Sequence, residues 1–236
     1  MWVQLIPGIA GYASLVIASG YSLAVLIAVL VWRAYVARPP QRQSVQPAVT
    51  ILKPLCGAEP ELYTHLRSFC RQEYPDYEII FGVLDPNDPA IPIAQRLKAE
   101  FPALPINIVV NPQRHGHNNK SSNLINMLAV ARNPILVISD SDTWVRPDYL
   151  AAVIGPVLDE RVGLVTCLSH DWPTAPVWSH LGAMYINEWY FPSVMLAWLF
   201  GWGIHGATAI VFFSGATLLA GAYNLFACDW IAEKVE

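Results

Sequence analysis

An uninterrupted apolar run near the amino terminus limits what this chain can fold into more than any other feature. Residues 2–32 contain no Asp, Glu, Lys or Arg, and residues 13–32 read ASLVIASGYSLAVLIAVLVW. About 20 apolar residues in a helix cross the hydrocarbon core of a bilayer, which is about 30 Å thick. A cleaved signal peptide would need a basic start and a small-residue cleavage site, and neither is present. The sequence therefore predicts a retained transmembrane helix over residues 1–36.

Basic residues on one side of this run predict its orientation. Arg33, Arg38 and Arg42 follow it, whereas residues 1–11 carry no basic side chain. The positive-inside rule then places the amino terminus outside and the rest of the chain in the cytoplasm. The four cysteines form no C-x-x-C pair, and we interpret them as free thiols of a reducing compartment.

The composition agrees with contact to a membrane. The chain has 236 residues, enough for one ordinary domain plus a membrane segment. Charged residues make up 14% of it, whereas soluble domains carry about 25%. The net charge of −4 gives no reason to expect nucleic acid as a partner.

Beyond a polar, proline-containing linker over residues 37–47, short apolar runs alternate with stretches of helical periodicity. We expect strands over residues 48–53, 77–84, 106–110, 134–139 and 162–167, and helices over residues 59–73, 89–101, 119–132 and 146–158. Such alternation is typical of an α/β domain with a mostly parallel sheet. Ligands of these sheets bind beyond the carboxyl ends of the strands. The sequence thus predicts a ligand-binding domain over residues 48–175.

The remaining region, residues 176–236, is harder to interpret. It contains no charged residue between Trp189 and Cys228. A second transmembrane helix over residues 193–211 is one alternative, but proline and glycine residues interrupt that stretch. Tryptophan and tyrosine are frequent there, and both favour the bilayer interface. We therefore expect amphipathic or re-entrant helices at the membrane surface, followed by a buried strand over residues 209–219.

The Asp140-Ser141-Asp142 segment directly follows a fully apolar predicted strand. Two carboxylates so placed suit Mg²⁺ or Mn²⁺, which bind oxygen ligands and often share them with substrate phosphates. The alternative is a turn, because Asp and Ser are common in loops for local hydrogen-bonding reasons. We predict Asp140 and Asp142 as metal ligands.

Four further charged residues lie near predicted strand or helix ends. Asp85, past the second strand, could accept a hydrogen bond from a nucleobase or ribose, whereas Asp88 suits the cap of the following helix. Lys120 lies at a helix start, where phosphates bind, or is a solvated loop lysine. Lys53 either approaches a nucleotide or is simply an exposed lysine.

Four sequence blocks in order resemble the ceramide glucosyltransferase family and the similar bacterial enzymes that glycosylate hopanoid lipids. The blocks are residues 51–57 (ILKPLCG), 81–89 (FGVLDPNDP), 118–124 (NNKSSNL) and 139–148 (SDSDTWVRPD), and the likeness extends from about residue 10 to 217. The resemblance implies a Rossmann-like GT-A fold. It also implies transfer of a sugar from UDP-glucose or UDP-N-acetylglucosamine to the hydroxyl of a ceramide-type or hopanoid-type lipid.

The resemblance also implies residue roles. Asp85 would contact uracil and ribose, Lys120 would support the nucleotide, and Asp140 and Asp142 would bind the metal and the diphosphate. The segment 213–217 (FSGAT) resembles the family's segment beneath the acceptor site.

After this segment the chain departs from the family's pattern. The family continues with a Gly-Gly-Phe turn, an acidic pair that contains the catalytic base, a Gln-x-x-Arg-Trp motif and membrane helices. Residues 218–236 hold neither the turn nor the motif, so Asp229 and Glu233 are the candidates for the base. Three functions stay open: a UDP-sugar-dependent lipid glycosyltransferase, a truncated non-catalytic UDP-sugar-binding remnant at the membrane, and a processive polysaccharide synthase.

Overall fold

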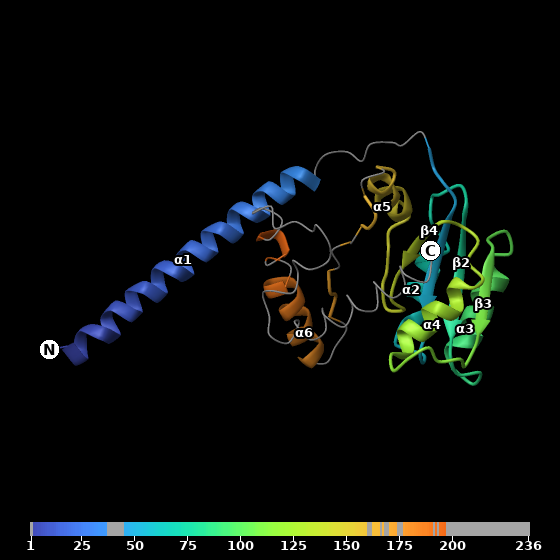
Figure 1. Cartoon of the computed structure of the whole chain (residues 1–236), viewed down its shortest axis with the longest axis horizontal. Helices are drawn as coiled ribbons and strands as arrows, with labels where there is room; N and C mark the ends of the chain where they lie inside the picture. Colours follow the sequence, from blue (N-terminus) through green and yellow to red (C-terminus); the bar gives the residue numbers. More distant parts are fainter. Residues whose placement is uncertain are drawn as a thin grey trace. The chain divides into compact units, whose positions relative to one another are not determined.

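The chain divides into two compact units in the computed structural model (Figure 1). One unit is Pro40–Thr166, and the other combines Met1–Pro39 with Cys167–Glu236. The structure describes residues 2–36, 45–159, 162–165, 167, 170–173, 177–190, 192 and 194–196. The expected linker residues 37–44 and the expected strand over 209–219 lie outside this described part.

The unit Pro40–Thr166 is built on a four-stranded parallel sheet. Its strands are β1 (Val49–Pro54), β2 (Tyr77–Val83), β3 (Ile106–Val110) and β4 (Ile135–Ile138), in the order β3-β2-β1-β4. The register places Val49 opposite Tyr77 on one side and Ile135 on the other. The chain steps from β1 to β3 in one direction and then returns to the far side of β1. Sheets of this kind bind ligands at the carboxyl ends of the strands where that direction reverses, here β1 and β4.

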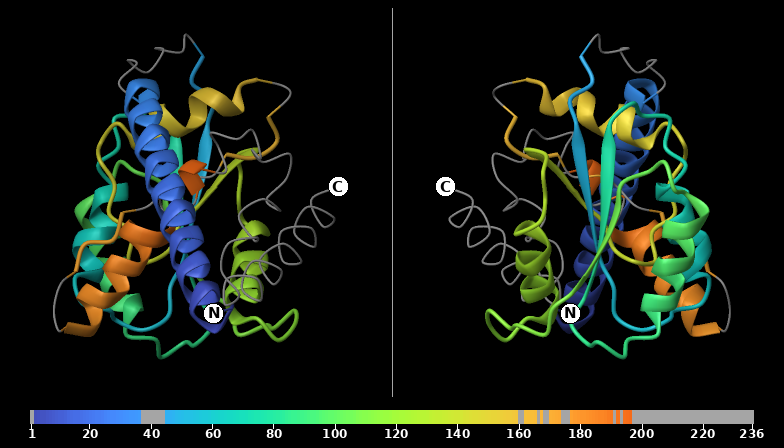
Figure 2. Two further views of the ribbon diagram at one scale, coloured as in Figure 1. Left: turned by 90° about the vertical axis from the view of Figure 1, so that its left-hand side faces the viewer. Right: turned by 90° about the vertical axis from the view of Figure 1, so that its right-hand side faces the viewer.

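Helices cover both faces of this sheet (Figure 2). They are α2 (Leu62–Phe69), α3 (Ala90–Glu100), α4 (Asn119–Leu128) and α5 (Tyr149–Val157). Side chains from α2, α3 and α5 pack on the face that carries Ile51 and Phe81. Helix α4 covers the opposite face, where the Asn123 amide donates to the Gly82 carbonyl oxygen at 2.8 Å. The predicted α/β fold with a parallel sheet is confirmed.

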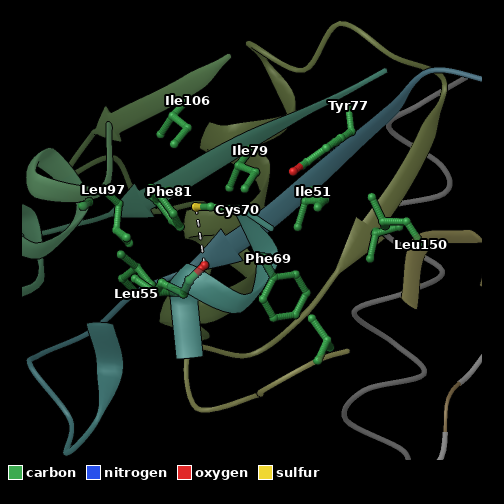
Figure 3. Close-up of a cluster of buried hydrophobic side chains, with 14 of the residues drawn as sticks. Ile51, Leu55, Phe69, Cys70, Tyr77, Ile79, Phe81, Leu97, Ile106 and Leu150 are labelled. Atoms are coloured by element: carbon green, nitrogen blue, oxygen red, sulfur yellow. Dashed lines mark hydrogen bonds between the residues drawn. The ribbon is translucent and has the colours of Figure 1, made fainter. Parts of the chain in front are cut away.

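Most buried apolar side chains belong to one core beneath α2, α3 and α5 (Figure 3). Neighbouring strands contribute Ile51, Ile79 and Phe81, which point to the same face because alternate residues of a strand do. Phe69 of α2 meets Tyr149 of α5 edge-on, with ring centroids 5.8 Å apart. Full burial of each large apolar side chain contributes about 1.5–3 kcal/mol. The core therefore holds firm the strands whose ends carry the functional residues.

Several predicted elements are shorter than expected, and one is wrong. Helix α2 begins at Leu62 because Glu61, its N-cap, has a left-handed backbone with φ of 63°. The expected strand over 162–167 is absent from its described residues. Instead, the Val162 N–H donates to the Asp159 carbonyl oxygen at 2.8 Å and closes a turn after α5.

The second unit contains the amino-terminal helix α1 (Trp2–Val36), helix α6 (Val177–Met184) and the π-helix η1 (Tyr185–Tyr190). The apolar run is therefore helical, as predicted. Within α1, the stretch Ala10–Ala34 is long and apolar enough to cross a membrane, by length and composition. Of the alternative span over residues 193–211, only residues 194–196 are described, and they are helical.

Candidate functional site

Lys53 fixes the Asp140-Ser141-Asp142 segment to the end of β1. Its Nζ donates to the Ser139 hydroxyl at 3.1 Å and also to the carbonyl oxygen of Asp140. The backbone adds a third link, because the Ser139 N–H donates to the Leu52 carbonyl oxygen at 3.2 Å. The segment after β4 is thus held by both the main chain and a side chain of β1.

The alternative in which Lys53 is an exposed lysine is wrong, whereas its approach to a nucleotide stays a prediction. Its side chain is fully buried, and its ammonium lies 3.6 Å from the centroid of the Phe69 ring. Burial lowers the pKa of Lys53 to about 7, while the charges of Asp140 and Asp142 act in the opposite direction. A lysine placed in this way supports the loop from within the core instead of presenting its charge to solvent.

Lys120 meets Asp140, so two residues singled out by the sequence come together at one point. The Lys120 ammonium forms an ion pair with Oδ1 of Asp140. Both side chains are about half exposed, at 51% and 57%, and so a ligand can reach them. The prediction that Lys120 lies at a helix start is confirmed, since α4 begins at Asn119.

At the start of α4, the lysine side chain is more available to a ligand than the backbone N–H groups are. The Asn118 side-chain oxygen accepts hydrogen bonds from the N–H groups of Lys120, at 2.8 Å, and Ser121, at 3.2 Å. Those two amide groups are therefore capped. A phosphate at this position would be met first by the Lys120 ammonium.

Glu59 is a site residue that the sequence analysis missed. Its Oε2 accepts a hydrogen bond from the Ser141 hydroxyl at 3.2 Å, which brings a third carboxylate to the Asp140-Ser141-Asp142 segment. The signal was its position just past the first strand, where ligand-binding residues of such sheets lie. The segment also forms a turn, in which the Thr143 N–H donates to the Asp140 carbonyl oxygen at 3.4 Å.

The two aspartates after β2 have different roles. Asp88 is buried and accepts hydrogen bonds from the N–H of Ala90 at 2.8 Å and from the N–H of Gly57 at 3.0 Å. Its predicted capping of the helix that follows is therefore confirmed, and it also ties that helix to the loop after β1. Asp85 is exposed and accepts from the Asn87 N–H at 2.8 Å. Asp85 is the one available to a ligand.

The oxygen donors of Asp140 and Asp142 fit a divalent cation that is shared with a substrate. Both residues are exposed, so their carboxylate oxygens are accessible. Mg²⁺ and Mn²⁺ are commonly held by one or two carboxylates together with phosphate oxygens. Across the described residues, no group of three or more His, Cys, Asp or Glu side chains gathers around a possible metal position. Phosphate oxygens would thus complete the coordination.

The candidate catalytic bases lie outside the part of the chain that the structure describes. Asp229, Glu233 and the segment 213–217 all fall beyond the described residues. Among the described cysteines, Cys56 and Cys70 are free thiols, and burial raises the pKa of Cys70 to about 12. Such a thiol stays protonated at neutral pH.

Curated relatives of this chain are ceramide glucosyltransferases. The enzyme of Candida albicans is 34% identical over 120 residues, which cover 46% of this chain and 22% of that protein. That of Komagataella phaffii is 37% identical over 111 residues, covering 45% and 21%. Ceramide glucosyltransferase 1 of Caenorhabditis elegans is 32% identical over 121 residues, covering 51% and 26%. The matched part thus spans about a quarter of the length of these relatives.

Among solved structures, a mannosyltransferase from Pyrobaculum calidifontis in complex with GDP-Man and Mn²⁺ matches 64% of this chain and 45% of its own, with a TM-score of 0.49 and 23% identity. A family model also matches this chain. The model of glycosyl transferase family 21 covers residues 12–219. It includes the amino-terminal helix from residue 12 onward, the parallel sheet and the Asp140-Ser141-Asp142 segment. The chain belongs to glycosyl transferase family 21.

Proposed function

We propose that this chain is a membrane-bound glycosyltransferase that transfers a sugar from a UDP-sugar, UDP-glucose or UDP-N-acetylglucosamine, to the hydroxyl of a ceramide-type or hopanoid-type lipid. The observation that carries the proposal is the meeting of Lys120 with Asp140 on a loop that Lys53 holds from below. One exposed lysine ammonium and two exposed carboxylates thus lie near the carboxyl end of β4. Membership of family 21 supports the same activity.

The site's own residues bind and orient the donor diphosphate. Asp140 and Asp142 would hold Mg²⁺ or Mn²⁺, and the cation would offset the charge that develops on the leaving nucleoside diphosphate. Asp140, the present partner of Lys120, would be one ligand of that cation, and the Lys120 ammonium would then pair with a phosphate oxygen of the donor. Asp85 lies after β2, the strand next to β1, and would accept hydrogen bonds from uracil or ribose.

Transfer requires a carboxylate that deprotonates the acceptor hydroxyl while the sugar is displaced with inversion. Asp229 and Glu233 are the candidates proposed from the sequence. Helix α1 would anchor the chain, with its amino terminus outside and the sheet domain in the cytoplasm. The side chains of α1 support this, because large apolar residues such as Leu15, Val16 and Ile17 are exposed along it.

Calorimetric titration of the purified full chain with UDP tests the donor site. We expect binding that requires Mn²⁺ and that weakens by about tenfold or more, or 1.4 kcal/mol, when Asp140→Asn and Asp142→Asn are combined. The matched control is Asp76→Asn, because Asp76 is an exposed aspartate at the opposite, amino-terminal end of β2. Unchanged UDP affinity in the double variant would contradict the assignment of Asp140 and Asp142 as metal ligands.

A transfer assay separates the enzyme from a protein that only binds the donor. The full chain in lipid vesicles is supplied with labelled UDP-glucose or UDP-N-acetylglucosamine and a lipid extract. Label that moves into the lipid fraction, and that is lost in the double variant, supports transfer. Manganese-dependent UDP binding without labelled lipid supports the non-catalytic alternative.

A further inference from the structure

Helix α6 carries its large apolar side chains on the side that faces away from the protein. The stripe consists of Val177, Trp178, Leu181 and Met184 of α6 together with Tyr185, the first residue of η1, and its members are between 44% and 75% exposed. At 3.6 residues per turn the four positions in α6 fall within an arc of about 120°. The small side chain of Ala183 lies roughly opposite that arc and is buried, at 4% exposed. A surface helix of a soluble protein normally shows the reverse arrangement.

The sequence around this α6 stripe is uncharged and rich in aromatic residues. Residues 172–187 contain no Asp, Glu, Lys or Arg. Trp172 is 83% exposed. The preceding residue, Asp171, is fixed to η1, because its N–H donates to the Asn187 side chain at 3.0 Å and its carbonyl oxygen accepts from that side chain at 2.8 Å. Tryptophan and tyrosine favour the boundary between lipid and water.

The residues that follow η1 lead directly to the membrane helix. Met195 and Leu196 are buried in one cluster with Ala28, which lies within the candidate span Ala10–Ala34. Ala28 is six residues before the end of that span, or about 9 Å at 1.5 Å per residue. Only four residues separate Tyr190, the end of η1, from Met195. Helix α6 and η1 are thus tethered to the region where α1 leaves the bilayer.

The distance of about 9 Å from Ala28 to the end of the candidate span is similar to the depth at which interfacial helices insert. Such helices lie in the membrane plane with an apolar face buried about 5–10 Å into the boundary of head groups and acyl chains. We propose that the α6 stripe docks into the lipid surface on the side where α1 ends, with Ala183 toward the protein. The proposal rests on the membrane placement of α1 proposed above, but it does not depend on sugar transfer.

Site-directed spin labelling of the full chain tests this docking. Nitroxides are attached at Leu181→Cys, on the stripe, and at Gly182→Cys, the adjacent residue, whose added side chain meets nothing within 4 Å. The background replaces the native cysteines, with Ala at buried Cys70. The protein is reconstituted into phosphatidylcholine vesicles that contain some phosphatidylglycerol. Collision rates with oxygen, which partitions into lipid, and with a water-soluble nickel chelate are then measured at each site.

We expect the Leu181 label to collide with oxygen several-fold more, and with nickel several-fold less, than the Gly182 label. Equal access of nickel to both labels would overturn the proposal. Shielding of the Leu181 label from both reagents would also overturn it, because a protein surface, such as a second copy of the chain, would then cover the stripe. A third label at Leu15→Cys in α1 reports the anchor separately. Lipid contact at Leu15 with nickel access at Leu181 refutes only the docking of α6.

Discussion

The ammonium of Lys53 donates a hydrogen bond to the Ser139 hydroxyl at 3.1 Å, across 86 positions of sequence. A buried ammonium is costly unless its donors are satisfied, and here it has the Ser139 hydroxyl, the Asp140 carbonyl oxygen and the face of Phe69 as partners. Each of the two hydrogen-bond partners belongs to the loop that carries the proposed metal ligands. The position of that loop therefore depends on a side chain that itself need not touch the ligand.

Replacing Lys53 with Met should separate stability from donor binding. Met removes the cost of a buried cation, and this relief offsets the lost hydrogen bonds, so we expect the free energy of unfolding to stay within about 1 kcal/mol. The loop loses its support, however, and UDP affinity in the presence of Mn²⁺ should fall. Thermal melts and calorimetric titration measure the two effects, with Lys98→Met, at an exposed lysine of α3, as the control. Wild-type affinity in Lys53→Met would show that the loop holds its position unaided.

Lys120→Gln should weaken binding of UDP while leaving binding of uridine unchanged, because the proposed partner of its ammonium is the diphosphate. The Lys120–Asp140 pair is exposed, and such pairs contribute about 0–1 kcal/mol, so the melting temperature should hardly change. Titrations with UDP and uridine at two salt concentrations measure this, with Lys98→Gln as the control. Equal weakening for both ligands would place Lys120 at the nucleoside instead.

Gly82→Ala should destabilise the sheet domain. A Cβ at Gly82 would clash with the Met127 sulfur and the Asn123 amide oxygen, both on α4. Overpacking of this kind costs about 1–3 kcal/mol. The matched control is Gly163→Ala, whose Cβ meets nothing within 4 Å. Thermal melts of the two variants compare them directly, and equal melting temperatures would mean that α4 lies farther from β2 than described.

Glu78 should make the stability of the domain sensitive to acid. Burial would raise the pKa of its carboxyl, but hydrogen bonds from the Arg132 backbone, the Thr50 hydroxyl and the Arg132 guanidinium outweigh burial and lower the pKa. A carboxyl whose folded pKa lies below its unfolded value of 4.5 stabilises the fold above that pH. This contribution is lost as the pH falls from 4.5 through the folded pKa.

The test for Glu78 is a comparison of melting temperature against pH for the wild-type chain and Glu78→Gln. At neutral pH the free energy of unfolding of the variant should be lower by about 1.5–3 kcal/mol, the usual contribution of a hydrogen bond to a charged group. Below pH 4.5 the two curves should converge. Parallel curves over the whole range would show that Glu78 does not titrate differently on folding.

The order of strands and helices could be predicted because buried parallel strands are nearly continuous apolar runs. The run over residues 135–138 is an example, and the aspartate that follows it is at the predicted strand end. The run over residues 162–167 has the same apolar character, yet its described residues form no strand. Local composition does not reveal whether a partner strand is available.

The burial of Lys53 could not be predicted from its neighbours in sequence. Its hydrogen-bond partners follow β4, which is next to β1 in the sheet but 86 positions away in the sequence. An isolated strand with one lysine favours exposure of that lysine. The role of Glu59 was missed for a similar reason, since its contact with Ser141 joins positions 82 residues apart. By contrast, Lys120 could be anticipated because the start of a helix is a local signal.

The pairing of β1 with both β2 and β4 has a consequence for how the site comes into being. Contacts from β1 to β2 join residues 28 positions apart, as in Thr50 and Glu78, whereas the contact from Lys53 to Ser139 spans 86. Closing the longer loop costs more chain entropy and is slower. A nascent chain can pair β1 with β2 well before the segment after β4 has been synthesised. The proposed donor site is therefore among the last features of the sheet domain to form, and its formation marks the completion of folding there.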